Sequence, residues 1–193
     1  MSKLEKLIQE LCPNGVEHKP LSEIVEITRG VRVVRSQLAE QGGYPVYQNS
    51  MTPLGYYEKS NCAAQTAFII AAGAAGEIGF SQVEFWAADD CFYFICPSNL
   101  QSRFLYYALL CQQSYIFSQV RRASIPRLSR SVIDRLKIPV PPLPVQQEIV
   151  RILDSFTERT DELNKTLEAE LTARRKQYEY YRDKLLTFKE KMA

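Results

Sequence analysis

The stretch that decides the architecture is Ile138-Pro-Val-Pro-Pro-Leu-Pro144, followed directly by residues 145–189, which contain neither proline nor glycine. Each proline ring fixes φ and removes a backbone donor, so the run predicts an extended, semi-rigid connection. Pro144 suits the first turn of a helix, where its missing N–H has no helical acceptor in any case. The sequence therefore predicts a globular domain over 1–143 and a long helix within 144–193.

Apolar residues recur at every third or fourth position along the predicted helix. This spacing is typical of a coiled-coil seam, and the extra step of four from Leu167 to Leu171 indicates a stutter. At 1.5 Å per residue the helix would be about 65–70 Å long. Its stripe is too long for its own domain to cover, and the alternative of a helical hairpin lacks a turn signal. The seam residues predicted to support dimerisation are Ile149, Leu153, Phe156, Leu163, Leu167, Leu171, Tyr178, Tyr181 and Leu185.

Upstream of the prolines, the sequence predicts an α/β domain of the α+β type, with a mixed β-sheet and peripheral helices. The apolar run over 66–72 is bounded by glycine and predicts a buried strand. The arginine-rich stretch 121–130 is expected to be irregular. Further strands are expected over 44–47, 80–86 and 91–96, a strand or short helix over 21–28, and helices over 2–12, after a cap at Asn99 and after a cap at Ser129.

No catalytic or metal-binding constellation is evident. The glycine-rich stretch 73–79 lacks the Gly-Lys-Ser/Thr of a phosphate loop and is not followed by a helix, which favours a tight turn between strands. The five cysteines form no Cys-x-x-Cys pair and His18 is the single histidine, so no zinc spacing exists. We expect reduced, buried thiols and a binding module without catalytic or metal-ligating residues.

The bulk composition limits the class of protein. With 46% hydrophobic and 24% charged residues among 193, the chain reads as a soluble globular protein. No stretch approaches the roughly 18 consecutive apolar residues of a membrane helix. The amphipathic N-terminus lacks the apolar core of a signal peptide, which predicts a cytoplasmic location without membrane attachment.

Basic residues cluster although the net charge is only +2. Acidic residues at 77, 84, 89 and 90 fall in other stretches, so one face could carry a positive potential. Scattered, solvated arginines remain an equal alternative on charge pattern alone. Arg and Lys suit guanine and phosphate, and Asn and Gln suit adenine. The candidate DNA-contacting residues are Arg29, Arg32, Arg35, Gln48, Asn49, Lys59, Arg121, Arg122, Arg127 and Arg130.

Several motifs resemble a known family. They are Leu11-Cys-Pro-Asn-Gly-Val-Glu17 with Leu21-Ser-Glu-Ile24, Tyr44-Pro-Val-Tyr47, Ile70-Ala-Ala-Gly-Ala-Ala-Gly-Glu-Ile-Gly79, Ile125-Pro-Arg-Leu-Ser129 and Ile138-Pro-Val-Pro-Pro-Leu-Pro-Val-Gln-Gln-Glu-Ile-Val-Arg-Ile-Leu-Asp154. Together they resemble the specificity subunits of Type I restriction-modification systems. The proline–glutamine–helix signature is the most specific of them, and the likeness covers nearly the whole chain.

The resemblance implies a non-catalytic subunit that binds double-stranded DNA and directs methyltransferase and restriction subunits to it. S-adenosylmethionine, ATP and magnesium would then belong to those partner subunits. It also implies antiparallel pairing of the long helices, here in a homodimer. Full-length members carry two recognition domains and two spacer helices, so this chain is either a natural half-subunit or a fragment. Two alternatives are a stand-alone dimeric DNA-binding regulator and a coiled-coil scaffold that binds no DNA.

Overall fold

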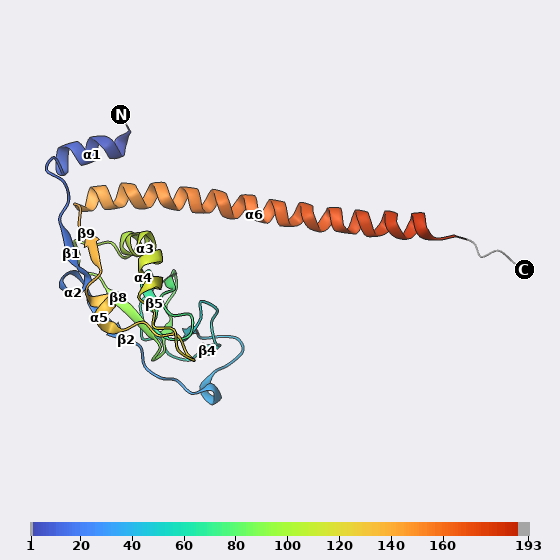
Figure 1. Ribbon diagram of the computed structural model, residues 1–193, viewed down its shortest axis with the longest axis horizontal. Helices are drawn as coiled ribbons and strands as arrows, with labels where there is room; N and C mark the ends of the chain where they lie inside the picture. The colour runs from blue at the N-terminus through green and yellow to red at the C-terminus, as the bar shows by residue number, and fades with distance from the viewer. Residues whose placement is uncertain (1, 189–193) are drawn as a thin grey trace, which may run out of the picture. The chain divides into compact units, whose positions relative to one another are not determined.

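A four-stranded antiparallel sheet lies at the centre of the first structural unit of the computed structural model, which describes residues 2–188 (Figure 1). The strands follow the order β2–β8–β5–β6. The inner strand β5 is buried at all of its residues, as its continuous apolar run predicted. The strands are β2 (Glu26–Arg29), β8 (Cys91–Ile95), β5 (Thr66–Ile70) and β6 (Ile78–Ser81).

Two smaller sheets complete the β structure. In one, β3 (Tyr44–Tyr47) pairs antiparallel with β4 (Tyr56–Tyr57) and parallel with β7 (Trp86–Ala87). In the other, β1 (His18–Pro20) pairs antiparallel with β9 (Lys137–Pro139). The predicted mixed β structure is therefore confirmed, and strands from opposite ends of the first unit lie side by side.

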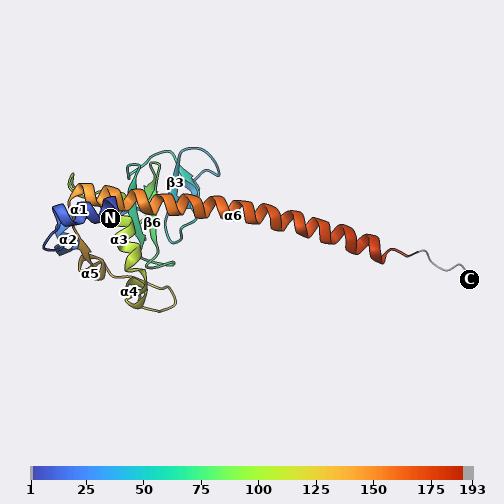
Figure 2. The same cartoon turned by 90° about the horizontal axis from the view of Figure 1, so that it is seen from above.

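Six helical segments precede the long helix. The helix α3 buries Phe104, Leu105 and Leu109 in the main hydrophobic core, together with Ile69 and Phe94 of the central sheet. Figure 2 shows α4 leading into the long loop that returns to α5. The segments are α1 (Lys3–Leu11), α2 (Leu21–Ile24), η1 (Arg35–Gln37), α3 (Ser102–Cys111), α4 (Gln113–Ser118) and α5 (Arg130–Asp134).

Three predictions about this unit were wrong. The N-cap of α3 is Gln101 rather than Asn99, because the chain makes a further turn, closed by Leu100 N–H to Pro97 C=O, before the helix begins. The expected strand over 80–86 is interrupted at residues 82–85 and contributes to two different sheets. The thiols are free, but Cys111 at the end of α3 is exposed and Cys96 is half-buried, rather than both being buried.

The long helix α6 runs from Leu143 to Leu186. Contacts divide the chain into two units, residues 1–150 and 151–193, so the first turns of α6 belong to the globular unit. The helix ends earlier than residue 189, and Thr187 instead bonds its hydroxyl to the Asp183 carbonyl oxygen at 2.6 Å. Lys189 lies outside the described residues. Within residues 2–188, none of the helices combines the length and apolar character needed to cross a membrane.

Gln146 fastens the start of α6 to the globular unit. Its side chain is fully buried, its Oε1 accepts from the Gln101 N–H at 2.8 Å, and its Nε2 donates to the carbonyls of Asn99 and Pro141 at 2.9 and 2.8 Å. All three hydrogen bonds of this amide go to backbone groups, and the bond to Pro141 is fully buried. The glutamine of the proline–glutamine signature is therefore a structural bracket.

Replacing Gln146 with leucine is expected to lower the free energy of unfolding by about 2–4 kcal/mol, because three hydrogen bonds would be lost and the buried Pro141 carbonyl would be left without its partner. Urea unfolding of the first unit's signal measures the loss. The exposed neighbour Gln147 is the matched control, and its change to leucine should stay within about 0.5 kcal/mol. Equal effects of the two changes would contradict the bracket.

The second unit presents an apolar stripe to solvent. Phe156, Leu163, Leu167 and Leu171 are 61%, 62%, 55% and 53% exposed, and Tyr178, Tyr181 and Leu185 are also exposed. Leu153 is half-buried, and Ile149 packs against the main core of the first unit. A single helix of this length with an uncovered apolar stripe is typical of one strand of a coiled coil.

Candidate nucleic-acid interface

Three arginines from distant parts of the sequence meet at one end of the central sheet. Arg29 ends β2, Arg127 lies beside the end of β5, and Arg130 begins α5. They line a hollow of about 220 Å³ together with Ala71, Ala72, Asp89, Asp90, Phe92 and Leu128. The structure thus brings together candidates that the sequence could only place in separate loops.

The turn between β7 and β8 forms one wall of the hollow. It is closed by the Cys91 N–H and the Ala88 carbonyl at 2.9 Å, with Asp89 and Asp90 at its tip. Arg29 Nε donates to the Asp89 carbonyl at 2.7 Å, which holds the guanidinium against the turn. At Gly30 the chain passes so close that a Cβ would lie 2.2 Å from the Ala88 oxygen, so only glycine fits.

The arginine-rich segment also contributes to the hollow, through Arg127, Leu128 and Arg130. Arg121 and Arg127 exchange backbone hydrogen bonds at 2.9 and 3.1 Å and close a short hairpin. The Leu128 N–H donates to the Ala71 carbonyl at 2.8 Å, so the segment lies beside the chain that leaves β5. The expectation of irregular chain is confirmed, because no strand or helix forms between residues 119 and 129, and two isolated bridges hold Arg121 and Arg127 in place.

Acidic residues share this site, contrary to the expectation that Asp89 and Asp90 lie elsewhere. The local sequence gave no hint of it, because the turn is folded back onto Arg29 by long-range strand pairing. Asp89 Oδ1 is buried and has no hydrogen-bond partner among the described residues. Arg130 is paired differently: its Nε donates to Asp134 Oδ1 at 2.6 Å, and its guanidinium lies 5.4 Å from the Phe92 ring centre.

The Gln48–Asn49 loop lies next to the hollow. The Asn49 carbonyl accepts from the Ala74 N–H at 2.9 Å in the glycine turn between β5 and β6. The Cys91 thiol lies within hydrogen-bonding distance of the Tyr47 and Gln48 carbonyls, at 3.3 and 3.1 Å. Burial raises the pKa of the Cys91 thiol, so it stays protonated and donates, holding the loop to the sheet.

The remaining candidates lie outside the lining of the hollow. Arg121 and Arg122 are exposed on the adjoining hairpin, where Arg122 lines a separate, largely apolar hollow with Phe117. Arg32 is exposed in the loop after β2, and Arg35 lies in η1. Lys59 is paired with Glu58 at 3.5 Å.

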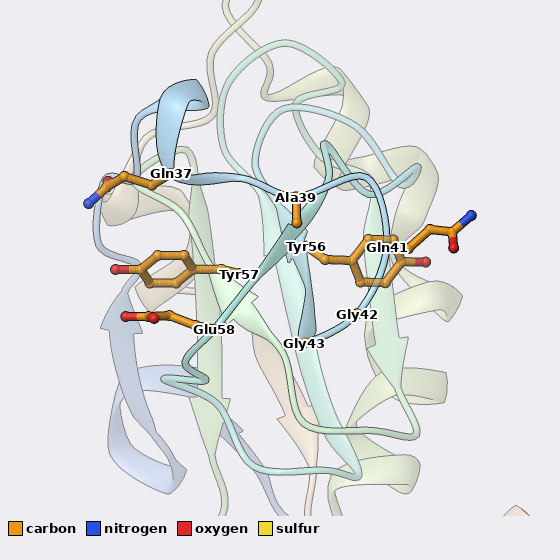
Figure 3. A pocket seen from close by; sticks show the side chains of 8 residues that line it. All are labelled: Gln37, Ala39, Gln41, Gly42, Gly43, Tyr56, Tyr57 and Glu58. Carbon is orange, nitrogen blue, oxygen red and sulfur yellow. The ribbon is translucent and has the colours of Figure 1, made fainter.

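A second hollow of about 530 Å³ lies around β4. Figure 3 shows Gln37, Tyr57 and Glu58 pointing to one side of it, and Tyr56 and Gln41 to the other. None of the candidate DNA-contacting residues lines this hollow. Across residues 2–188, the structure shows no cluster of His, Cys, Asp and Glu placed to hold a metal ion.

Residues 13–173 match the family model described as the Type I restriction modification DNA specificity domain. The chain belongs to this family. The specificity-domain match covers both the interface described above and much of α6.

Individual relatives agree with this assignment. A Haemophilus influenzae protein named as a type I restriction enzyme specificity subunit is 35% identical over 97% of this chain and 49% of its own length. A Mycoplasma pneumoniae protein named as a type I specificity subunit is 30% identical over 86% of this chain and 46% of its own length. This specificity-family chain therefore spans about half the length of these curated relatives.

Solved structures share the fold. The crystal structure of a Type I restriction-modification S subunit from M. genitalium matches 84% of this chain and 45% of its own with a TM-score of 0.70 and 22% identity. The HsdS subunit from Thermoanaerobacter tengcongensis matches 84% of this chain and 44% of its own, with a TM-score of 0.62 and 17% identity. At these identities, the likeness establishes the architecture of the specificity domain and its helix.

Proposed function

We propose that this chain supplies DNA sequence specificity to a Type I restriction-modification complex, binding one DNA half-site through the end of the sheet that carries Arg29, Arg127 and Arg130. The observation that carries the proposal is that these arginines, from distant parts of the sequence, line one hollow at the end of the sheet. Hydrogen bonds position the side chains of Arg29 and Arg130, and positioned guanidinium groups suit base and phosphate recognition. The exposed Arg121 and Arg122 on the neighbouring hairpin would contact phosphates.

In this proposal the chain binds DNA and positions its partner subunits, but it catalyses no reaction. Methyl transfer would belong to a methyltransferase subunit with S-adenosylmethionine, and ATP- and magnesium-dependent cleavage to a restriction subunit. The chain's own contribution would be the choice of DNA site. Copurification with a methyltransferase subunit separates this role from that of a stand-alone regulator, and DNA affinity separates it from a scaffold.

We further propose that the stripe on α6 pairs antiparallel with the helix of a second copy. The exposed apolar residues support the pairing, and the family resemblance supports its direction. Paired in this way, the two copies would read two inverted half-sites separated by unread base pairs. Since α6 has 44 residues, its length of about 66 Å corresponds to about two turns of DNA at roughly 34 Å each.

Replacing Arg121 and Arg122 together with glutamine is expected to weaken binding to DNA of any sequence. With each phosphate contact that is lost, binding releases fewer counterions. The magnitude of the slope of log K against log salt then falls by about 0.9 per contact. Fluorescence anisotropy on a duplex of mixed sequence, repeated over a salt series, measures both quantities. The expected result is a smaller slope together with lower affinity at low salt.

Arg159 and Arg175 on α6 provide a control that removes the same charge from exposed positions far along the sequence. Their replacement with glutamine should leave the slope unchanged. If the hairpin pair leaves affinity and slope unchanged, this end of the sheet is not the DNA face. If the wild-type chain shows no salt-dependent DNA affinity, the scaffold alternative gains the advantage.

A further inference from the structure

The seam of α6 is spaced symmetrically about Leu167. This seam consists of the exposed apolar stripe and two polar residues that continue its spacing, Thr160 and Arg174, both exposed. From Leu153 to Leu167 the seam residues follow one another in alternating steps of three and four, and from Leu167 to Tyr181 the same steps recur in reverse order. Each seam residue before Leu167 therefore has a counterpart at the same distance after it. The counterparts are Leu163 with Leu171, Thr160 with Arg174, Phe156 with Tyr178, and Leu153 with Tyr181.

This symmetry fits a second copy of the same helix. In a pair related by a two-fold axis, residue i of one copy contacts residue j of the other, and j contacts i. With the axis at Leu167, every seam residue of one antiparallel copy lies level with a seam residue of the other. A helix that pairs with an unrelated protein gains nothing from such counterparts within its own seam.

The polar layer distinguishes this register from its neighbours. Sliding one copy by a heptad in one direction places Arg174 level with Leu167, and in the other direction level with Leu153. Either slide also leaves one leucine next to the centre of the seam out of step. A polar seam residue is known to fix the register of a coiled coil, because other registers bury it against apolar side chains.

Both polar side chains already have partners on their own helix. The Thr160 hydroxyl donates to the Phe156 carbonyl at 2.8 Å. The Arg174 Nε lies 3.6 Å from Glu170 Oε1, and its Nη1 donates to Gln177 Oε1 at 3.2 Å. A layer of Thr160 and Arg174 therefore brings no unpartnered charge into the seam.

A parallel pair would also match the spacing, because each residue would meet its own copy. It would set Arg174 against Arg174 across the seam, and like charges placed opposite each other destabilise an interface. The antiparallel pair sets Arg174 against a neutral threonine instead. The charge at this one position thus favours the antiparallel direction.

We propose that two copies of α6 pair antiparallel about a two-fold axis at Leu167, with Thr160 of each copy level with Arg174 of the other. The inference rests on the proposed self-pairing of α6 and names its register and the residues that set it. The second structural unit begins at Arg151, sixteen residues before the axis. At 1.5 Å per residue, the two Arg151 positions would lie about 48 Å apart along the pair.

The experiment measures distances between spin labels on the two copies of the full chain. Arg159 and Arg175 are exposed and lie eight residues before and after Leu167. Each is changed to cysteine and labelled in a chain that also carries Cys111→Ser, because Cys111 is exposed. The register predicts the same separation for both labels, about 24 Å along the helices, whereas a slide of one heptad predicts about 14 Å for one and about 35 Å for the other. The labelled Cys111→Ser chain without an added cysteine provides the background.

A second variant tests the polar layer. Arg174→Leu removes the constraint on sliding, so both distance distributions should broaden. Lys176→Leu removes the same charge from an exposed position outside the seam and should leave both distributions unchanged. If the two variants behave alike, Arg174 does not set the register, and that part of the inference is overturned.

The outcomes separate the register from the pairing itself. Equal separations near the expected value support the axis at Leu167. Unequal separations, or two short separations as in a parallel pair, overturn the register while self-pairing stands. A wild-type chain that light scattering shows to be monomeric overturns the register together with self-pairing, and anisotropy on DNA then shows whether the DNA-binding proposal stands without them.

Discussion

Replacing Leu163 and Leu167 with glutamate is expected to turn a paired chain into monomers. Both leucines lie on the exposed stripe of α6, at 62% and 55% exposure. Burying a leucine in a helix–helix seam contributes about 1.5–3 kcal/mol, and an unpaired glutamate in its place adds a desolvation penalty. In a symmetric pair each change counts twice, so dimerisation should be lost throughout the micromolar range. Light scattering measures the mass directly.

The variant that no longer dimerises should also lose its affinity for a bipartite DNA target. Glutamates at Lys165 and Ala169, which lie on the other side of the helix, add the same residues without touching the stripe. This control should remain dimeric. A wild-type chain that is monomeric at micromolar concentration in the absence of partner proteins would count against self-pairing. The stripe would then require a different helix.

Gly30→Ala is expected to destabilise the first unit by about 3 kcal/mol or more and to abolish DNA binding. An added Cβ would lie 2.2 Å from the Ala88 oxygen and 2.4 Å from the Ala87 oxygen. Both are backbone atoms, so the strand and the β7–β8 turn would have to move apart. That turn carries Asp89 and holds Arg29, so the site would be displaced along with the fold. Urea unfolding and anisotropy on DNA measure the two effects.

Gly15 is the matched control for this change. Its φ is +92°, and nothing lies within 4 Å of its added Cβ. Alanine there should cost about 1–2 kcal/mol through the left-handed backbone alone. If Gly30→Ala lowers the free energy of unfolding no more than Gly15→Ala does, then glycine is not required at position 30 by the close approach of the turn.

The parts of the fold that depend on local pattern were predictable from the sequence. The proline run and the absence of breakers predicted α6, and the continuous apolar run predicted β5. The glycine turn was correctly distinguished from a phosphate loop, and Gly73 and Gly76 have positive φ there. In each case, neighbouring residues carry the physical cause, so a periodicity or a backbone requirement is visible along the chain.

The site depended on contacts between distant segments and could be predicted only in part. Arg29 and Arg127 were candidates as single residues, but their meeting with Asp89 follows from the pairing of β2, β8 and β5. Nothing near Asp89 in the sequence distinguishes it from a surface turn residue. Gln146 lay within a motif that was noticed, yet its three bonds connect it to backbone that only the fold brings near.

The pairing of β1 with β9 sets His18 opposite Pro139, so the part of the first unit between these two strands begins and ends at neighbouring points. A domain with adjacent ends can be lifted out of one polypeptide and placed in another without moving the flanking chain. A genetic exchange with crossovers near these two strands would replace the proposed DNA-contacting surface as a unit while keeping the helix that follows. One such exchange would then change the DNA target, without gradual substitution of one contact after another.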